Sequence, residues 1–340
     1  MPSSTIAEAV TLPGPLAVAM GDPAGIGPET IAKAWQERQA LGLPPFFAVG
    51  TPEAFEQVWA GPVQVVSDPD AAAAAWHEAL PVIRIDGGGE VRPGQPTLEG
   101  ARNSLDSLEL AVGLARSGVA SALVTGPVSK AQLYAVGFTH PGQTEFVAER
   151  CGIAGEMVAM MLAGPTLRTV PVTTHIALKD VPAALSTELI VVKGRTVIRA
   201  LRRLFGIERP RLAVAGLNPH AGEEGALGRE EIEMVAPAIE RLREEEAEVT
   251  GPHPPDTMFH GRARARYDAA LCLYHDQALV PLKTLHFDEG VNITLGLPLV
   301  RTSPDHGTAF DIAGRDLANP SAMIAALRMA ADCARRVAGG

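Results

Sequence analysis

Residues 15–35, PLAVAMGDPAGIGPETIAKAW, contain a short apolar run, a glycine-rich loop and a helical pattern in that order. The first part, PLAVAM (15–20), has the length and composition of a buried strand. Pro28 and Glu29 are typical of the first turn of a helix, which we expect to continue through IAKAW. This unit of strand, loop and helix indicates an α/β fold.

The same order of apolar run, loop and helical segment recurs along the chain. Further strands are predicted at 46–50, 121–125, 168–174, 211–217 and 268–274. Helices are predicted at 104–117, 188–205, 229–247 and 320–337. Strands that alternate with helices favour a largely parallel sheet. We therefore predict an α/β protein with a mostly parallel sheet, in which residues 1–14 form a disordered tail and residues 15–340 form two lobes with discontinuous boundaries.

The net charge and the cysteines restrict the class of protein. A net charge of −10 argues against a nucleic-acid partner, because phosphate backbones require clustered Lys and Arg. Cys151, Cys272 and Cys333 form no CxxC pair and no disulfide framework, which is typical of the reducing cytosol. Residues 1–14 lack the features of a secretory signal, and no stretch is long enough to span a bilayer. We expect a cytoplasmic protein without a membrane partner.

Three of the nine histidines come directly after predicted strands, namely His175, His220 and His275. Open α/β sheets bind their ligands beyond the carboxyl ends of the strands. Three imidazoles delivered there could hold a divalent metal and leave one coordination position open. Each histidine by itself also fits an ordinary loop position, so the prediction of a metal site depends on all three together.

The loop at 21–29 follows a strand and opens a helix, which suits anion binding by free backbone N–H groups. As a dinucleotide fingerprint it is weak, because only Gly25 and Gly27 match G-x-G-x-x-G and Thr30 occupies the third position. A tight turn without a ligand explains the loop equally well.

Cations near the third histidine point to an anionic substrate. Lys130 and Lys283 are two of only five lysines, and both are predicted in loops just beyond strands. Lys283, Asn292 and Arg301 lie within one segment and supply two cations and an amide, which a small anionic substrate requires. His306 is either a further polar site residue or an ordinary loop histidine.

Taken together, the motifs resemble those of the 4-hydroxythreonine-4-phosphate dehydrogenases of pyridoxal 5′-phosphate biosynthesis. The motifs are MGDPAGIGPE (20–29), VTGPVSK (124–130), GQTEF (142–146), TTH (173–175), GLNPHAGE (216–223), PPDTMF (254–259), YHDQ (274–277) and GVNITLGLPLVRTSPDHGTAFDIAG (290–314). The resemblance implies a fold similar to that of isocitrate and isopropylmalate dehydrogenases, with an active-site cleft between two lobes. Residues 15–340 would then be a single catalytic chain.

The resemblance also implies roles for particular residues. The three metal-binding histidines of the family correspond to His175, His220 and His275. Its substrate-binding residues correspond to Lys283, Asn292, Arg301 and Thr144, and Asp256 and Lys283 are the candidate catalytic residues. Where family members have a His-Thr pair, this chain has Gln143-Thr144. Glutamine can hydrogen-bond the substrate, but it carries no charge and shuttles no proton. His140, three residues earlier, is a possible substitute.

The implied reaction is the NAD- or NADP-dependent oxidation of 4-phosphooxy-L-threonine at C3. Metal-assisted decarboxylation then gives 3-amino-2-oxopropyl phosphate. One divalent metal (Zn, Mg or Co) and a homodimer with a shared active site are implied as well. The general base is either Asp256 or a metal-bound water. The alternatives are a dehydrogenase of 4-phospho-D-threonate or 4-phospho-D-erythronate, a phosphate acyltransferase-like protein without a histidine metal site, and a non-catalytic binding protein.

Overall fold

The first predicted unit consists of strand β1 (Leu16–Ala19), the glycine loop and helix α1 (Gly27–Leu41) in this computed structural model, which describes residues 12–245 and 247–339. All of β1 is buried, and Pro28 and Glu29 occupy the first turn of α1 as predicted. A side chain at Gly27 would collide with the carbonyl oxygen of Met20, so the tight turn requires glycine. Residues 1–11 of the predicted tail 1–14 lie outside the described residues.

The strands of the described residues form one twelve-stranded sheet in the order β3-β4-β2-β1-β5-β12-β11-β6-β7-β10-β8-β9. After β1, the strands are β2 (Phe46–Gly50), β3 (Val63–Val66), β4 (Leu80–Arg84), β5 (Leu123–Thr125), β6 (Ala159–Gly164), β7 (Leu167–Pro171), β8 (Arg211–Ala215), β9 (Glu248–His253), β10 (Ala269–Cys272), β11 (Val291–Leu295) and β12 (Arg301–Pro304).

Helices connect most of these strands. After α1, they are α2 (Pro52–Glu56), α3 (Pro69–Ala75), α4 (Leu98–Arg116), α5 (Lys130–Ala135), α6 (Gln143–Arg150), α7 (Val181–Ala184), α8 (Thr187–Phe205), α9 (Ala236–Arg243), α10 (Pro255–Met258), α11 (Gly261–Arg264), α12 (His275–His286) and α13 (Ser321–Gly339). The predicted helix at 229–247 is shorter than expected, because a π-helical turn (Glu231–Val235) precedes α9. No helix of the described residues is long and apolar enough to cross a membrane.

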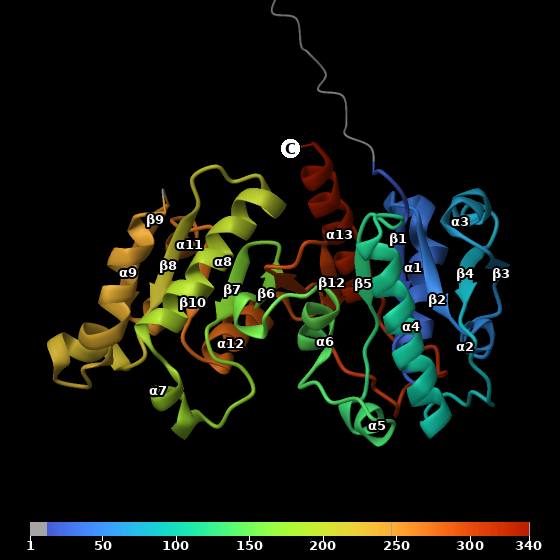
Figure 1. Cartoon of the computed structure of the whole chain (residues 1–340), viewed down its shortest axis with the longest axis horizontal. Coiled ribbons are helices and arrows are strands. Elements are labelled where there is room, and N and C mark those ends of the chain that lie inside the picture. Colours follow the sequence, from blue (N-terminus) through green and yellow to red (C-terminus); the bar gives the residue numbers. More distant parts are fainter. Residues whose placement is uncertain (1–11, 246, 340) are drawn as a thin grey trace, which may run out of the picture.

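The predicted α/β class with a mostly parallel sheet is confirmed. Neighbouring strands are parallel from β3 to β12 and again from β7 to β9. Only the central pairs β12–β11, β11–β6 and β6–β7 are antiparallel. Figure 1 shows the elements of the two parallel parts side by side, with α13 near the place where they meet. The boundaries of the two lobes within residues 15–340 stay a prediction.

The strands that precede the three histidines end earlier than predicted. β7 ends at Pro171, β8 at Ala215 and β10 at Cys272, so short loops lead to His175, His220 and His275. The direction of each imidazole is therefore decided by a loop and not by the alternation of side chains along a strand.

Candidate active site

A cavity of about 510 Å³ lies where the loops after β5 and β7 meet α6, α12, β11 and β12. It is lined by nine residues that the sequence singles out, namely Lys130, Gln143, Thr144, His175, His275, Lys283, Asn292, Arg301 and His306. Two others, His220 and Asp256, are exposed and are not among the residues that line it. The fold thus brings most of the predicted site together from segments that are distant in the chain.

Arg301 is a buried cation at the base of this cavity, where only 3% of its surface is exposed. Its guanidinium donates hydrogen bonds to Thr125 Oγ1 (2.7 Å), Thr294 Oγ1 (3.0 Å) and Gln143 Oε1 (3.2 Å), which are all neutral acceptors. Burial lowers the pKa of Arg301 to about 10, so the side chain stays charged at neutral pH. Its Nε has no partner among the described residues. The charge is therefore available to an anionic ligand.

Gln143 connects two walls of the cavity. It is the first residue of α6, and its Nε2 donates to Gly126 O (3.1 Å) while its Oε1 accepts from Arg301. Both the nitrogen and the oxygen of the Gln143 side-chain amide are thus engaged in hydrogen bonds within the protein. His140 does not take over the missing histidine role, because its Nε2 lies 2.7 Å from Glu149 Oε2 and it does not line the cavity.

Lys283 lies inside α12 and not in a loop, which corrects the prediction from the sequence. The helix continues through Pro281 and carries Lys283 to the cavity wall. Its Nζ lies 3.1 Å from Asp305 Oδ2, so this lysine is partly neutralised. On the neighbouring strand β11, the buried Oδ1 of Asn292 has no partner among the described residues. It is a second polar atom that a ligand could satisfy.

His175 and His275 lie next to each other at the cavity, with ring centroids 5.4 Å apart. His275 Nδ1 lies 2.7 Å from Asp276 Oδ1, which leaves Nε2 as the open ring nitrogen. Burial lowers the pKa of His175, and the charges of Lys130 and His275 lower it further. The neutral imidazole is the form that binds a metal ion. This pair therefore fits two ligands of a divalent metal.

His220 lies away from this pair on the turn Pro219–Gly225, which follows β8. His220 has a φ of +53°, and the next four residues also have positive φ values, so the backbone runs left-handed. Helix α10, which carries Asp256, contacts this turn. Among the described residues, no three His, Cys, Asp or Glu side chains are grouped to hold a metal. One chain thus supplies two of the three predicted ligands at one place.

A buried carboxylate holds the start of the His220 turn. Glu231 is 3% exposed, and its Oε1 accepts from the backbone N–H groups of Leu217 (2.8 Å) and Asn218 (2.7 Å). Its Oε2 accepts from Asn218 Nδ2 (3.0 Å). These three bonds offset part of the cost of left-handed backbone at residues other than glycine.

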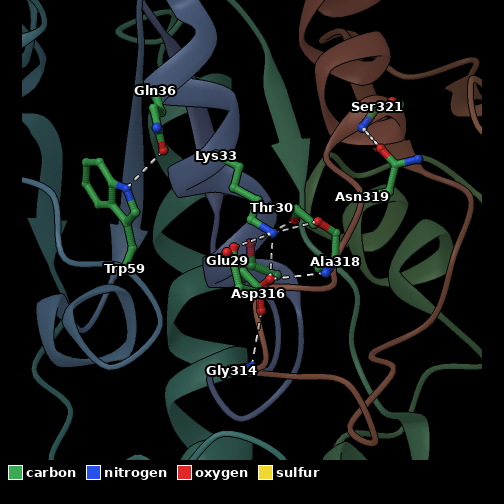
Figure 2. Close-up of polar contacts among 11 residues, drawn as sticks. Glu29, Thr30, Lys33, Gln36, Trp59, Gly314, Asp316, Ala318, Asn319 and Ser321 are labelled. Atoms are coloured by element: carbon green, nitrogen blue, oxygen red, sulfur yellow. Dashed lines mark hydrogen bonds and ion pairs between the residues drawn. The ribbon is translucent and has the colours of Figure 1, made fainter.

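A similar arrangement anchors the segment after β12, which Figure 2 shows. Glu29, 1% exposed on α1, accepts from the backbone N–H groups of Gly314 (3.1 Å) and Ala318 (3.1 Å). Lys33 bonds to Glu29 (2.9 Å) and to Asp316 (2.9 Å). The anchored segment begins with Asp305 and His306, which both line the cavity. His306 lies in this loop and lines the cavity, and its buried Nε2 has no partner among the described residues.

Comparisons with known proteins agree with this geometry. The family model described as "Pyridoxal phosphate biosynthetic protein PdxA" matches residues 44–330. The chain belongs to the PdxA family.

Relatives across this family match almost the whole chain. A 4-hydroxythreonine-4-phosphate dehydrogenase of Zymomonas mobilis is 55% identical over 94% of this chain and 96% of its own. A 4-hydroxythreonine-4-phosphate dehydrogenase of Caulobacter vibrioides is 52% identical over 95% of this chain and 98% of its own. The crystal structure of the Klebsiella pneumoniae 4-hydroxythreonine-4-phosphate dehydrogenase superposes with a TM-score of 0.84 at 37% identity, covering 94% of this chain and 99% of that one. The resemblance inferred from the motifs is confirmed.

Three charged residues of this PdxA-family cavity were not identified from the sequence, namely Glu145, Lys193 and Asp305. Glu145 directly follows the Gln143-Thr144 pair in the first turn of α6, and this adjacency is the signal that could have found it. Lys193 lies within α8, where the spacing of apolar residues predicts which face of the helix is buried but does not show that a residue lines a cavity. Its Nζ donates to Val158 O, and burial lowers its pKa. Only the packing of α8 against the cavity reveals its position.

Proposed function

We propose that this chain oxidises 4-phosphooxy-L-threonine at C3 with NAD or NADP and decarboxylates the product to 3-amino-2-oxopropyl phosphate, within pyridoxal 5′-phosphate biosynthesis. The observation that carries the proposal is the buried, unneutralised guanidinium of Arg301 in the same cavity as the His175–His275 pair. Family membership and the names of the relatives support the same reaction.

In this proposal Arg301, Asn292 and Lys283 bind the anionic groups of the substrate, and Gln143 and Thr144 complete that part of the site. Charged hydrogen bonds from a partly dehydrated cavity are strong, and the fixed geometry reduces the entropy cost of reaching the transition state. During oxidation the proton of the C3 hydroxyl passes to a base, for which Asp256 is the candidate, and the hydride leaves C3. The bond from C2 to the carboxylate then breaks, CO2 departs, and C2 receives a proton, for which Lys283 is the candidate donor.

His175 and His275 would hold a divalent metal together with His220. A bound Zn, Mg or Co ion would supply Lewis-acid polarisation of the substrate oxygen, and the nicotinamide of NAD or NADP would accept the hydride. The three cysteines are free, which is consistent with a cytoplasmic enzyme.

We further propose that the active site is shared in a homodimer. His220 and Asp256 are exposed on contacting segments, and neither lines the cavity of its own chain. Both would enter the cavity of a second copy, because a two-fold dimer presents the same surfaces reciprocally.

A subunit-mixing experiment tests the shared site. His220→Ala and His275→Ala are each expected to be inactive as homodimers. After unfolding and refolding together, random mixing should restore about a quarter of the wild-type activity, because one of the two sites in each mixed dimer is intact. If mixed dimers form but stay inactive, the two histidines do not come from different chains.

The reaction itself is tested by NADH or NADPH formation with purified protein, with and without a chelator. Turnover of 4-phosphooxy-L-threonine that stops on metal removal supports the proposal. Gln143, which stands where family members have a histidine, leaves open a rival substrate class, 4-phospho-D-threonate or 4-phospho-D-erythronate. Preferential turnover of either rival compound would show that the proposed substrate is wrong. The proposal that the chain carries out a metal-dependent oxidation would still stand.

A further inference from the structure

A second cavity, of about 490 Å³, lies apart from the central cavity that holds Arg301 and the His175–His275 pair. Its lining comes from three segments, namely residues 152–154 with Met157, the α8 residues Thr196, Arg199, Ala200, Arg203 and Leu204, and residues 296–297. Among the described residues, this α8 cavity and the central cavity share none in their linings. The reaction proposed above assigns the α8 cavity no role.

Both crossings of the chain between the two halves of the sheet run along the α8 cavity. Strands within residues 16–125 and 301–304 make up the half from β3 to β12, and strands within residues 159–295 make up the half from β11 to β9. After α6 the chain crosses through residues 151–158, and it returns through residues 296–300. Because both crossings contribute to the lining, a ligand in the α8 cavity would contact both at once.

Helix α8 holds each crossing by side-chain hydrogen bonds. In the first crossing, Thr196 Oγ1 donates to Met157 O (3.1 Å). In the second, the guanidinium of Arg203 donates to Leu297 O (2.8 Å) and to Pro298 O. The two crossings are thus tied to one helix, and all three surround the α8 cavity.

A single short segment separates the α8 cavity from the central cavity. Gly155 and Val158 line the central cavity, whereas Met157 between them lines the α8 cavity. On the same helix as Thr196, Lys193 lines the central cavity and its Nζ donates to Val158 O. A displacement of this segment therefore changes both cavities.

The charge of the α8 cavity suits an anion. Among the described residues that line it, the only charged ones are Arg199 and Arg203. Arg203 lies in the last turn of α8, where a cation complements the helix dipole and needs no ligand. Arg199 lies further from the helix end, is exposed, and forms no hydrogen bond or ion pair within the described residues. Its charge is therefore available to a ligand.

The rest of the lining is largely apolar. Ile153, Leu204 and Leu297 contribute branched side chains, and Met157 is 42% exposed. Methionine adapts its shape to varied apolar partners. The volume of the α8 cavity is within the usual range of small-molecule sites. The cavity therefore matches a small molecule that carries an anionic group on an apolar body.

We propose that the α8 cavity is an effector site for a small amphiphilic anion, with the anionic group at Arg199 and the apolar body against Met157 and Leu297. The bound molecule fixes the two crossings relative to each other. A cleft between two lobes closes by movement about the segments that join them, so the bound molecule slows closure of the central cavity. The inference goes beyond the proposed function, and the binding of the anion does not depend on it.

The test uses 8-anilinonaphthalene-1-sulfonate, a fluorescent sulfonate on an aromatic body, and its uncharged analogue N-phenyl-1-naphthylamine. Arg199→Gln removes the cation, Ala154→Trp fills the cavity from an exposed position, and Arg209→Gln removes an exposed cation outside it. In fluorescence titrations we expect Arg199→Gln to weaken binding of the sulfonate on the order of 10-fold and to leave the uncharged analogue unaffected. Ala154→Trp should weaken the binding of both compounds, and Arg209→Gln the binding of neither.

Hydrogen exchange and turnover test the effector role. At a concentration that leaves Arg199→Gln largely unbound, the sulfonate should slow amide exchange in residues 151–158 and 296–300 of wild type and not of the variant. In the proposed reaction it should lower kcat several-fold without raising KM, because it slows closure and does not compete for the substrate site.

Equal affinities for the sulfonate in wild type and Arg199→Gln would overturn the inference, because the molecule would then bind elsewhere. A rise in KM alone would place it in the central cavity and overturn the inference too. Binding without slower exchange in the two crossings would contradict the effector role. If the chain oxidises no substrate, the proposed function is wrong, and fluorescence and exchange still decide the inference.

Discussion

The imidazole rings of His175 and His275 lie with their centroids 5.4 Å apart because the strands that precede them are neighbours. β7 and β10 pair in parallel, with Val170 opposite Leu271, so their carboxyl ends lie at the same edge of the sheet. β8 is the next strand along and also pairs in parallel with β10. The left-handed turn after β8 nevertheless places His220 on the surface, away from the pair.

Removal of either paired histidine is expected to abolish tight metal binding. Loss of a residue that only orients a ligand costs about 10- to 100-fold in metal affinity, so a direct ligand should cost more than about 100-fold. We expect this larger loss in His175→Ala and His275→Ala, and the smaller one in Asp276→Asn, because Asp276 orients His275. Titration of metal-free protein with Co²⁺ measures all three. His286→Ala, at the far end of α12, is the control and should bind like wild type.

Loss of the Glu231 carboxylate is expected to destabilise the His220 turn. Glu231→Ala leaves the backbone N–H groups of Leu217 and Asn218 without their acceptor, and the Asn218 side-chain amide keeps only its bond to Glu230. The free energy of unfolding in urea should fall by about 2–3 kcal/mol, the usual cost of breaking charged, buried hydrogen bonds. Glu233→Ala, which removes an exposed ion pair with Arg229, should cost less than about 0.5 kcal/mol. Similar losses in the two variants would contradict the anchoring role.

Asp316 is expected to tolerate glycine better than alanine. Its φ is +60° and its side chain is 89% exposed, so its ion pair with Lys33 contributes little. Asp316→Gly relieves the left-handed backbone and should change stability by less than about 0.5 kcal/mol. Asp316→Ala puts at this left-handed position a residue that tolerates it less well than Asp does, and should cost about 1 kcal/mol. Thermal unfolding of both variants checks the order, and greater stability of the alanine variant would refute it.

The Asp268–Arg211 pair is expected to make stability depend on acid pH. Burial raises the pKa of Asp268, but hydrogen bonds from the side chain and backbone of Arg211 outweigh it, so the net pKa is lowered. A carboxyl with a lowered folded pKa contributes stability above its unfolded pKa, and the contribution is lost as the pH falls through the folded value. Asp268→Asn should therefore be about 1–2 kcal/mol less stable than wild type at pH 7. The difference should shrink below about pH 4. A difference that is constant with pH in urea unfolding would show that the charge of Asp268 is irrelevant.

Much of the substrate site is readable from the sequence because its residues lie close together in the chain. Lys283, Asn292 and Arg301 come from one segment, and all three line the cavity. Glu145 and Lys193 line it as well, and only Glu145 has a local signal, which is its position next to the Gln143-Thr144 pair. Glu145 reads as an ordinary acidic residue in a helix turn, and Lys193 as part of a helix face. Contacts between residues distant in sequence reveal their role.

The sequence by itself determined the alternation of strands and helices, the place of Pro28 and Glu29 in the first turn of α1, and the histidine-bearing loops, because strand and helix periods and turn residues act over a few residues. Only the tertiary structure decided that β12 inserts between β5 and β11, and so brings Arg301 to Thr125 and Gln143. It also decided that His175 and His275 meet while His220 turns away. Strand order and loop direction depend on the pairing and packing of distant segments, which the local pattern of residues does not encode.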